Sequence, residues 1–376
     1  MEIKNNKKIL KIVVASGGSG GHATPIVAVI DELKKRFGEQ IKIFWLGTNQ
    51  GIERKLAVNE QVEFKAIISG KWRRYFSVQN MLDIFKVLIG ILQSLYYLLK
   101  IKPQAIFSKG GFVGLPVVIA GAILRKKIVI HESDVWPGLA NRLSAKFASQ
   151  IAVAYQESEI YFRKKVTVTG TPVRNKILAG NKLSTCKRFS LDYQLPTLLV
   201  IGGSAGAKFL NDLILASLSE LLKHYQIIHL CGKNNYQETK EEFTRKLNIK
   251  DIQPVWQNRY HLFTWLDEEL ADAYSAADLI ISRAGANVLA EIAALSKAAI
   301  LVPITRAGDH QRFNAEIWRK NKAAYVLYEE ELKPQKLIET LAKILSNRQE
   351  LEKIGQNARQ FYDPNSAAKI VDLIIK

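Results

Sequence analysis

Four glycine-rich turns are the residues of this sequence best placed to do chemistry, because each directly follows an apolar run typical of a β-strand. They are GGSGGH (17–22), SKGGFVG (108–114), GGSAGA (202–207) and SRAGANVLAEI (282–292). Backbone N–H groups and a helix N-terminus at such a turn attract anions, phosphates above all. A glycine turn is also a common structural connection, so the turns by themselves predict phosphate binding only as one of two interpretations.

Two familiar nucleotide sites do not fit these turns. A dinucleotide site wants an acidic residue at the end of the second strand, to hold the ribose. Here the second strands end Leu46-Gly47-Thr48 and Cys231-Gly232-Lys233, without a carboxylate. Neither the turn at 17–22 nor the turn at 202–207 has the GxxxxGK[ST] pattern of a P-loop. The sequence therefore argues against a nicotinamide or flavin dinucleotide and against a P-loop nucleotide.

Two titratable residues belong to these turns. His22 ends the first turn, and an imidazole with a pKa of about 6.5 suits a general base at neutral pH. Glu291 lies six residues beyond Gly285, on the helix that the fourth turn opens, where a carboxylate could accept two hydrogen bonds from a ribose diol. The structural alternatives are a histidine that only orients the loop and a solvated helix glutamate.

Metal ligands are not apparent in the sequence. There is no DxD motif and no His/Cys cluster at metal-ligand spacing, and His131 and Glu132 are strand neighbours whose side chains point to opposite faces. We expect neither a catalytic metal nor a cofactor.

The elements that must position these residues form two series of strands alternating with helical patterns. The first series is expected at 9–15, 41–47, 62–68, 105–110, 127–133 and 150–155, and the second at 166–170, 197–203, 227–232, 279–285 and 298–304. Continuous apolar strands separated by helices predict parallel sheets covered on both faces. The expected fold is α/β, with two Rossmann-like, doubly wound domains in tandem.

Domain boundaries follow from the same pattern. A loop-rich region, 170–196, separates the two series, so the boundary is placed near residue 168. We expect a first domain over 1–168, a second domain over 169–345, and C-terminal helices over 346–376 that pack back toward the first domain. A chain of 376 residues is long enough for two such cores.

Charge and cysteine content limit the class of partner and the cellular compartment that we expect. The formal net charge is +19, with 26 basic and 12 acidic residues in 1–168 against 28 and 23 in the remainder. The basic first half predicts an anionic partner: nucleic acid, acidic lipid or a phosphorylated substrate. Two cysteines and no signal-peptide pattern predict a reducing, cytoplasmic compartment.

One segment combines basic and aromatic residues. KWRRYFSVQNMLDIFK (71–86) suits an anionic membrane interface, although the same mixture could bind nucleic acid or simply flank a packed helix. The apolar run that follows, VLIGILQSLYYLL (87–99), is too short to cross a bilayer and is expected to be a buried helix.

Six motifs together resemble one family. GGSGGH, HESD (131–134), GTPVR (170–174), GGSAGA, SRAGANVLAE (282–291) and DHQRFNA (309–315) occur in the order and spacing of the MurG family, over nearly the whole chain. Members of that family are inverting glycosyltransferases that move N-acetylglucosamine (GlcNAc) from UDP-GlcNAc to the MurNAc 4-hydroxyl of lipid I, forming lipid II for peptidoglycan. The resemblance implies the GT-B architecture, with acceptor on the first of two facing domains and donor on the second.

The resemblance also implies donor-site roles. Ser204 and its turn would hold the UDP diphosphate, and Arg174 would add positive charge to that leaving group. Glu291 would bind the ribose diol, Gln311 would bond GlcNAc hydroxyls, and uracil would sit near Leu266. The residues expected to line the donor pocket are Ala286, Asn287, Val288 and Leu289.

On the acceptor side, Ser19, Gly20 and Gly21 would face the acceptor pyrophosphate. The favoured base is His22. The family commonly has asparagine where this chain has Asp134, so Asp134 is both a substrate-binding candidate and an alternative base.

The resemblance implies partners as well: UDP-GlcNAc, a polyprenyl-linked acceptor and an anionic membrane surface, with no nucleic acid, for a peripheral enzyme on the cytoplasmic face of the cell membrane. Three other functions remain open. The first two are other GT-B enzymes, a diacylglycerol glycosyltransferase or a nucleotide-sugar epimerase. The third is a nucleotide-sugar-binding protein without catalysis.

Overall fold

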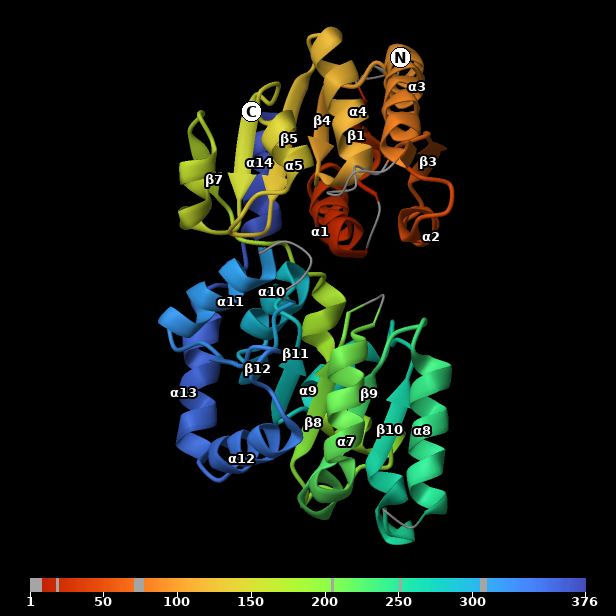
Figure 1. Cartoon of the computed structure of the whole chain (residues 1–376). Helices are drawn as coiled ribbons and strands as arrows, with labels where there is room; N and C mark the ends of the chain where they lie inside the picture. The colour runs from red at the N-terminus through yellow and green to blue at the C-terminus, as the bar shows by residue number, and fades with distance from the viewer. Residues whose placement is uncertain (1–8, 18–19, 71–77, 204–205, 250–251, 305–309) are drawn as a thin grey trace, which may run out of the picture. The chain divides into compact units, whose positions relative to one another are not determined.

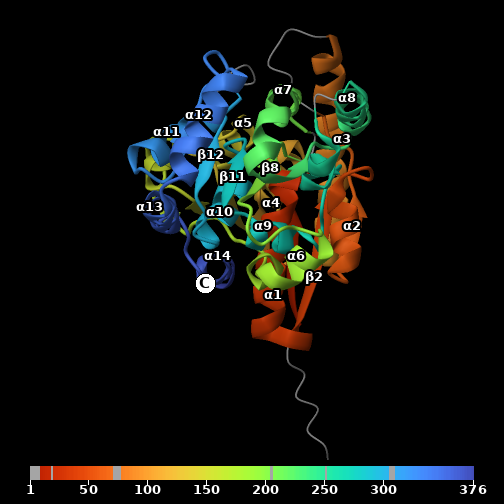
Figure 2. The same ribbon diagram turned by 90° about the horizontal axis from the view of Figure 1, so that it is seen from below.

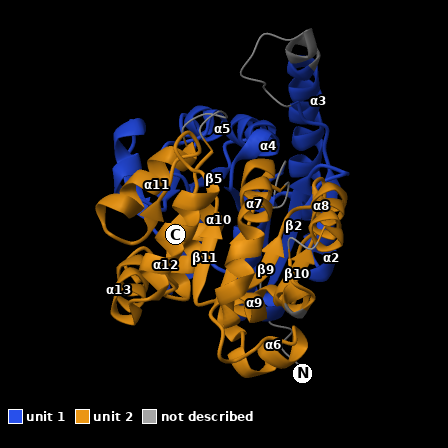
Figure 3. Cartoon of the chain, turned by 60° about the horizontal axis from the view of Figure 1, so that its bottom comes forward, with its two compact units in different colours: residues 1–174, 363–376 blue, residues 175–362 orange. Residues whose placement is uncertain are grey.

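The chain divides into two compact units, each built on one parallel sheet (Figures 1 and 3). The computed structural model describes residues 9–17, 20–70, 78–203, 206–249, 252–304 and 310–376. Unit 1 comprises Met1–Arg174 and Asp363–Lys376, and unit 2 comprises Asn175–Tyr362. The division after Arg174 falls a few residues beyond the expected boundary at 168.

Seven parallel strands form the sheet of unit 1, in the order β3-β2-β1-β4-β5-β6-β7. They are β1 (Leu10–Ala15), β2 (Ile41–Gly47), β3 (Glu63–Ala66), β4 (Ala105–Ser108), β5 (Lys127–Glu132), β6 (Gln150–Val153) and β7 (Val166–Val168). Strand β7 completes this sheet, whereas the sequence pattern suggested that 166–170 opened the second series. Because β7 pairs with β6, its residues belong to the first core.

Helices cover both faces of this sheet because successive residues of a strand point to opposite sides. Ile12 and Val14 of β1 join one core cluster, and Val13 and Ala15 join the other. The helices are α1 (Gly20–Phe37), α2 (Ile52–Asn59), α3 (Val78–Ile101), α4 (Gly111–Ile123), α5 (Leu139–Ser144) and α14 (Ser366–Ile375), with short 3₁₀ turns at Gly38–Gln40 and Gln156–Tyr161. The first cluster lies under α1, α2 and α14, and the second under α3 and α4.

The C-terminal helix returns to unit 1. Ile370, Val371 and Ile374 of α14 are buried in the same cluster as α1, and Arg36 of α1 pairs with Asp372 at 2.5 Å. The sequence-based expectation placed everything from residue 346 with the first domain. The structure gives that position to α14 alone, because the preceding helix buries its apolar face in unit 2.

Unit 2 has six parallel strands in the order β10-β9-β8-β11-β12-β13, and Figure 2 shows β8, β11 and β12 side by side. They are β8 (Thr197–Ile201), β9 (Gln226–Leu230), β10 (Tyr260–Phe263), β11 (Leu279–Ser282), β12 (Ala299–Leu301) and β13 (Tyr325–Val326). The sequence pattern missed both edge strands. β10 is half-buried and β13 has two residues, so neither shows a continuous apolar run.

The helices of unit 2 bury apolar faces against this sheet. They are α6 (Lys182–Arg188), α7 (Lys208–His224), α8 (Tyr236–Asn248), α9 (Leu270–Ala276), α10 (Ala286–Ala294), α11 (His310–Lys320), α12 (Pro334–Leu345) and α13 (Arg348–Arg359), with 3₁₀ turns at Asn175–Ala179 and Pro254–Arg259. One core cluster joins β8, α7 and α12 through residues such as Val200, Leu218 and Leu341.

Each sheet reverses its strand order at one point, between β1 and β4 in unit 1 and between β8 and β11 in unit 2. In open α/β sheets the crevice beyond the carboxyl ends of the strands at such a switch point is the usual ligand site. All four glycine-rich turns follow these four strands. The fold therefore gathers the turns in pairs, one pair per unit.

Helix α3 differs from the expectation of a buried helix. One side packs against unit 1 through Ser94 and Leu98, which have 0% exposure. The opposite side leaves large apolar side chains exposed at helical spacing: Phe85, Leu88, Leu92, Tyr96 and Leu99. Among the described residues, Asp83–Ile101 is the one stretch long and apolar enough to cross a membrane, and 22% of its most apolar 18 residues are buried within the fold.

Candidate active site

The switch point of unit 1 brings two glycine turns into direct contact. The Lys109 N–H donates to Ala15 O at 3.0 Å, so β1 and β4 stay paired to their ends. Gly111 has a φ of +73°, and a Cβ there would lie 2.4 Å from Gly17 O and 3.1 Å from the His22 ring. Only glycine therefore allows the turn after β4 to lie against the turn after β1.

His22 lies in the first turn of α1, partly exposed. Its ring is hydrogen-bonded to the main chain of Lys109, and Nδ1 is buried without a hydrogen-bond partner among the described residues. That bond must therefore use Nε2–H, which leaves the Nδ1 lone pair to accept a proton. Burial of the ring, and next the positive charge of Lys109, lower the pKa of His22 to about 4. The imidazole is neutral at neutral pH.

A buried carboxylate organises the turn that follows β5. Glu132 Oε1 accepts from the N–H groups of Ser133 at 2.8 Å and Asp134 at 3.0 Å. Its Oε2 accepts from Gly138 N and Asn141 Nδ2, both at 3.0 Å. Four bonds to one side chain fix the turn, and they hold the partly exposed Asp134 at the carboxyl edge of the sheet. The sequence alone gave no sign that Glu132 holds this turn.

His131 faces away from that turn. Its Nε2 lies 2.9 Å from Gly170 O, and the side chain is fully buried. Burial, and next the charge of Lys109, hold the pKa of His131 well below its usual value. This histidine ties β5 to the GTPVR segment and offers no surface to a ligand.

Lys109 is the second residue that sequence reasoning missed. It directly follows β4 in the glycine turn SKGGFVG, and its side chain is 1% exposed. The ammonium donates to Ser133 Oγ at 2.7 Å. A lysine inside a glycine turn at the end of a buried strand was the available signal.

The third glycine turn of the chain, 202–207, opens the switch point of unit 2. Gly206 has a φ of +82°, and a Cβ there would lie 2.4 Å from Cys231 O. The turn can thus pack tightly against the end of β9 before α7 begins at Lys208. Ser204, expected to hold the diphosphate, lies outside the described residues, as does Ser19 of the first turn.

A buried hydrogen-bond chain supports this turn from below. Asn211 Nδ2 donates to Cys231 O at 3.0 Å, so its Oδ1 is free to accept from His229 Nε2, also at 3.0 Å. His229 Nδ1 must then accept the hydroxyl proton of Tyr260, at 2.7 Å. Burial lowers the pKa of His229 to about 3, which keeps it neutral. The chain fixes the carbonyl that Gly206 packs against.

The turn after β11 is anchored on two sides. Arg283 Nη1 donates to Val302 O at 2.9 Å and pairs with Glu329 at 2.5 Å, and Asn314 Nδ2 donates to Ala284 O at 3.1 Å. Gly285 caps α10 without a side-chain hydrogen bond. The first turn of α10 is therefore a rigid helix N-terminus that presents N–H groups, the arrangement that favours anions.

The four residues expected to line the donor pocket differ in solvent exposure. Ala286, Asn287 and Val288 are partly exposed at the start of α10. Leu289 is 0% exposed and its N–H donates to Gly285 O at 3.0 Å. Leu289 therefore packs behind the surface, and the expectation that it lines the pocket is wrong for its side chain.

Glu291 is not the solvated helix glutamate of the structural alternative. Its side chain is 9% exposed, and Oε2 accepts the hydroxyl of Tyr274 at 2.7 Å. A carboxylate this buried keeps a fixed orientation because its partner is itself fully buried on α9. The arrangement offers a preoriented acceptor close to the start of α10.

The other expected donor residues lie at the ends of strands or units. Gln311, partly exposed in the first turn of α11, accepts from Ile304 N at 3.2 Å through Oε1. Leu266 follows β10 and is 6% exposed. Arg174 is the last residue of unit 1 and is also 6% exposed.

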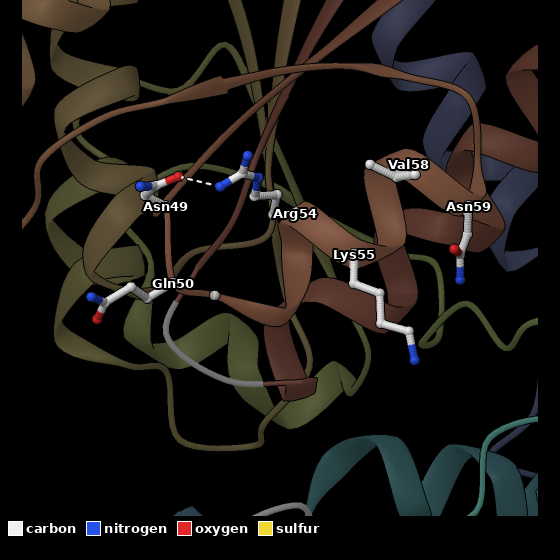
Figure 4. Close-up of a pocket in the computed structure, with 7 residues that line it drawn as sticks. Asn49, Gln50, Arg54, Lys55, Val58 and Asn59 are labelled. Carbon is white, nitrogen blue, oxygen red and sulfur yellow. Dashed lines mark hydrogen bonds between the residues drawn. The ribbon is translucent and has the colours of Figure 1, made fainter.

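A separate, open pocket of about 380 Å³ lies beside α2 (Figure 4). Its lining residues are Asn49, Gln50, Gly51, Arg54, Lys55, Val58 and Asn59. Arg54 Nη1 donates to Asn49 Oδ1 at 2.7 Å. The lining includes none of the residues expected in the site. Within the described part of the chain, no three His, Cys, Asp or Glu residues are grouped as metal ligands would be.

With this geometry in place, comparison with known proteins decides the family. The chain matches the glycosyltransferase family 28 N-terminal domain over residues 12–153 and the glycosyltransferase family 28 C-terminal domain over 197–372. It is 40% identical, over 97% of its length and 99% of the relative, to the Clostridium kluyveri UDP-N-acetylglucosamine–N-acetylmuramyl-(pentapeptide) pyrophosphoryl-undecaprenol N-acetylglucosamine transferase. The chain belongs to the MurG family.

Other relatives agree with this assignment. The Clostridium botulinum transferase of the same name is 40% identical over 90% of the chain and 92% of that relative. The crystal structure of Acinetobacter baumannii MurG is 28% identical and covers 97% of this chain and 98% of its own, with a TM-score of 0.72. The MurG family is thereby confirmed, as is the GT-B fold predicted from the sequence.

Fold alone does not separate the MurG family from some other enzymes. A Neisseria meningitidis UDP-GlcNAc 2-epimerase bound to UDP-GlcNAc has a TM-score of 0.68 over 97% of this chain and 100% of its own, at 14% identity. Such a likeness shows the shared fold and no more. The activity must therefore be argued from the site residues.

Proposed function

We propose that the protein transfers GlcNAc from UDP-GlcNAc to the MurNAc 4-hydroxyl of a polyprenyl-pyrophosphate-linked acceptor, with inversion at the anomeric carbon. The reaction type agrees with the family to which the chain belongs. The observation that carries the proposal is His22, a neutral imidazole at the switch point of unit 1 with an unengaged Nδ1. An inverting transfer needs such a base beside the acceptor.

The proposed step moves one proton and one glycosyl group. The acceptor oxygen forms a bond to the anomeric carbon while the bond from that carbon to the UDP phosphate oxygen breaks. The hydroxyl proton passes to His22 Nδ1, and negative charge develops on the departing diphosphate. The Gly202–Ala207 turn and the α7 N-terminus would stabilise that charge, assisted by Arg174 and Ser204.

Glu291 would select the nucleotide. Its buried carboxylate, oriented by the hydrogen bond from the Tyr274 hydroxyl, would bind the ribose diol. Ala286, Asn287, Val288, Gln311 and the main chain near Leu266 would surround the rest of the donor. This assignment makes unit 2 the donor-binding unit and unit 1 the acceptor-binding unit.

Asp134 has a supporting part in this scheme. Glu132 fixes its main chain through a hydrogen bond of 3.0 Å, and the carboxylate would accept a bond from a sugar hydroxyl of the acceptor. His22 is favoured as the base because its ring lies beside both glycine turns, 3.1 Å from where a Cβ on Gly111 would be.

Membrane contact would use the exposed apolar side of α3. Phe85 is 62% exposed, Leu92 66% and Leu99 58%, on one side of a helix in the strongly basic half of the chain. Apolar side chains with nearby cations suit the interface of an anionic membrane. We infer peripheral attachment at the cytoplasmic face, which the polyprenyl-linked acceptor requires. The basic part of the predicted segment, 71–77, lies outside the described residues.

One assay tests the activity directly. UDP release is measured with UDP-GlcNAc alone and with added lipid I analogue, and the product is identified by mass spectrometry. We expect release to depend on the acceptor and the product to gain one GlcNAc. Conversion of UDP-GlcNAc without acceptor would favour an epimerase, and binding without turnover would favour a sugar-nucleotide-binding protein.

A further inference from the structure

Lys109 is a buried cation. Its side chain is 1% exposed, and within the described part of the chain its Nζ donates to a neutral oxygen, Ser133 Oγ, at 2.7 Å. An ammonium ion has three N–H donors, and taking it out of water without compensation is costly. The cost of burying this ammonium suggests a role that needs its charge and that an apolar side chain could not fill.

The titratable groups that interact with Lys109 lie on α1, on β5 and in the turn that follows β5. Glu132 and Asp134, at the end of β5, oppose the loss of its charge, whereas burial lowers the pKa of the ammonium. The two histidines near it, His22 from α1 and His131 from β5, both feel its positive charge. Lys109 therefore lies between two carboxylates and the candidate base.

The geometry excludes direct substrate contact by this side chain. At 1% exposure the ammonium cannot reach a ligand. Its two routes of influence are visible in the structure: the main chain of Lys109 bonds the His22 ring, and the side chain bonds Ser133 in the turn that holds Asp134. One residue thus links the base to the turn fixed by Glu132.

We propose that Lys109 is a positioning residue for the transfer: its buried ammonium fixes the 133–138 turn and sets the charge environment in which His22 accepts the acceptor proton. This inference rests on the proposed function. It assigns to the SKGGFVG turn a role beyond the close approach of its glycines, namely to hold the base neutral and ready for the proton.

Lys109→Gln tests the role of the charge. Glutamine keeps an N–H for Ser133 Oγ but removes the charge, and Lys109→Met keeps the length without either. The measurement is kcat/KM for the acceptor from pH 4.5 to 8, which reports the free enzyme. Wild type should show no histidine limb above about pH 5, since the pKa of His22 is about 4. Both variants should show an acid limb shifted upward by about one pH unit, because a cation next to the imidazole has been removed.

Ser133→Ala is the matched control. It removes the hydrogen bond and keeps the charge, so it should lower kcat while showing, like wild type, no histidine limb above about pH 5. A ¹³C-histidine NMR titration of His22 in each variant gives the same answer independently of turnover. An unshifted limb and an unshifted His22 titration in Lys109→Gln would overturn the proposal. Absence of acceptor-dependent transfer by wild type would instead overturn the proposed function, which separates the two failures.

Discussion

At the scale of single residues, Glu291 combines burial against a fixed partner with a position close to the start of α10. Its carboxylate is 9% exposed and keeps a fixed partner, Tyr274 Oη, at 2.7 Å. It also lies less than two turns from the start of α10, where a ligand can arrive. A charged group so constrained loses little entropy when it accepts further hydrogen bonds.

Glu291→Ala should weaken donor binding by about 2–4 kcal/mol, because two charge-assisted hydrogen bonds to the ribose are lost. The measurement is the KM for UDP-GlcNAc, and a 2′-deoxyribose donor should lose much of its sensitivity to the change. Tyr274→Phe is the matched control, since it removes only the orienting hydroxyl and should have a smaller effect. An unchanged donor KM in Glu291→Ala would refute the ribose assignment.

The sequence could predict some of these residues and not others. His22 ends a glycine turn, and Glu291 lies on the helix that another glycine turn opens, so the positions of the turns predict where these two side chains lie. Glu132 and Lys109 act through buried contacts with Gly138, Asn141 and Ser133, which depend on how β4 and β5 pair. The spacing of residues along the sequence does not show which strands pair. The roles of Glu132 and Lys109 could therefore be identified only from the structure.

At the scale of elements, apolar runs predicted the central strands and failed at the edges. Central parallel strands are covered on both faces, and β8 is buried at every position. The edge strand β10 is partly buried at three of its four positions and gives no such signal. Apolar composition also failed to predict the exposure of α3. Its composition suits a buried helix, although one side is exposed.

Leu92→Glu should reduce binding to vesicles that contain anionic lipid by roughly tenfold or more, because burying a leucine contributes about 1.5–3 kcal/mol. Sedimentation with vesicles measures it. Leu183 of α6 is the matched control, since it has the same 66% exposure but lies in unit 2. If Leu183→Glu weakened vesicle binding as much as Leu92→Glu, α3 would not be the membrane-contacting element.

At the scale of the whole molecule, each unit keeps a buried neutral histidine. His131 ties β5 to Gly170 in unit 1, and His229 joins Asn211 to Tyr260 in unit 2. Burial is the main cause that lowers both pKa values, to about 3 for His229 and well below the usual value for His131. Since unfolding frees both rings to take up protons, the stability of the fold is linked to pH.

The free energy of unfolding should therefore fall as the pH is lowered below about 6.5. In that range the unfolded chain binds protons that the folded chain does not, and each such histidine removes about 1.4 kcal/mol per pH unit. Urea unfolding at pH 7.5, 6.5 and 5.5 measures the slope. His229→Gln, which cannot titrate, should reduce the slope by one histidine's share. An equal slope in this variant would show that His229 is not one of the linked groups.

The central claim is that His22, at the switch point of unit 1, is the base for GlcNAc transfer. The most direct measurement is kcat for His22→Ala and Asp134→Asn in the acceptor-dependent assay. The account predicts a reduction of about 10²–10⁴-fold for His22→Ala, the usual contribution of a general base, with little change in the donor KM. Asp134→Asn keeps the shape of the side chain and should have a mild effect. A crippled Asp134→Asn enzyme beside a His22→Ala enzyme altered mainly in acceptor KM would contradict the account.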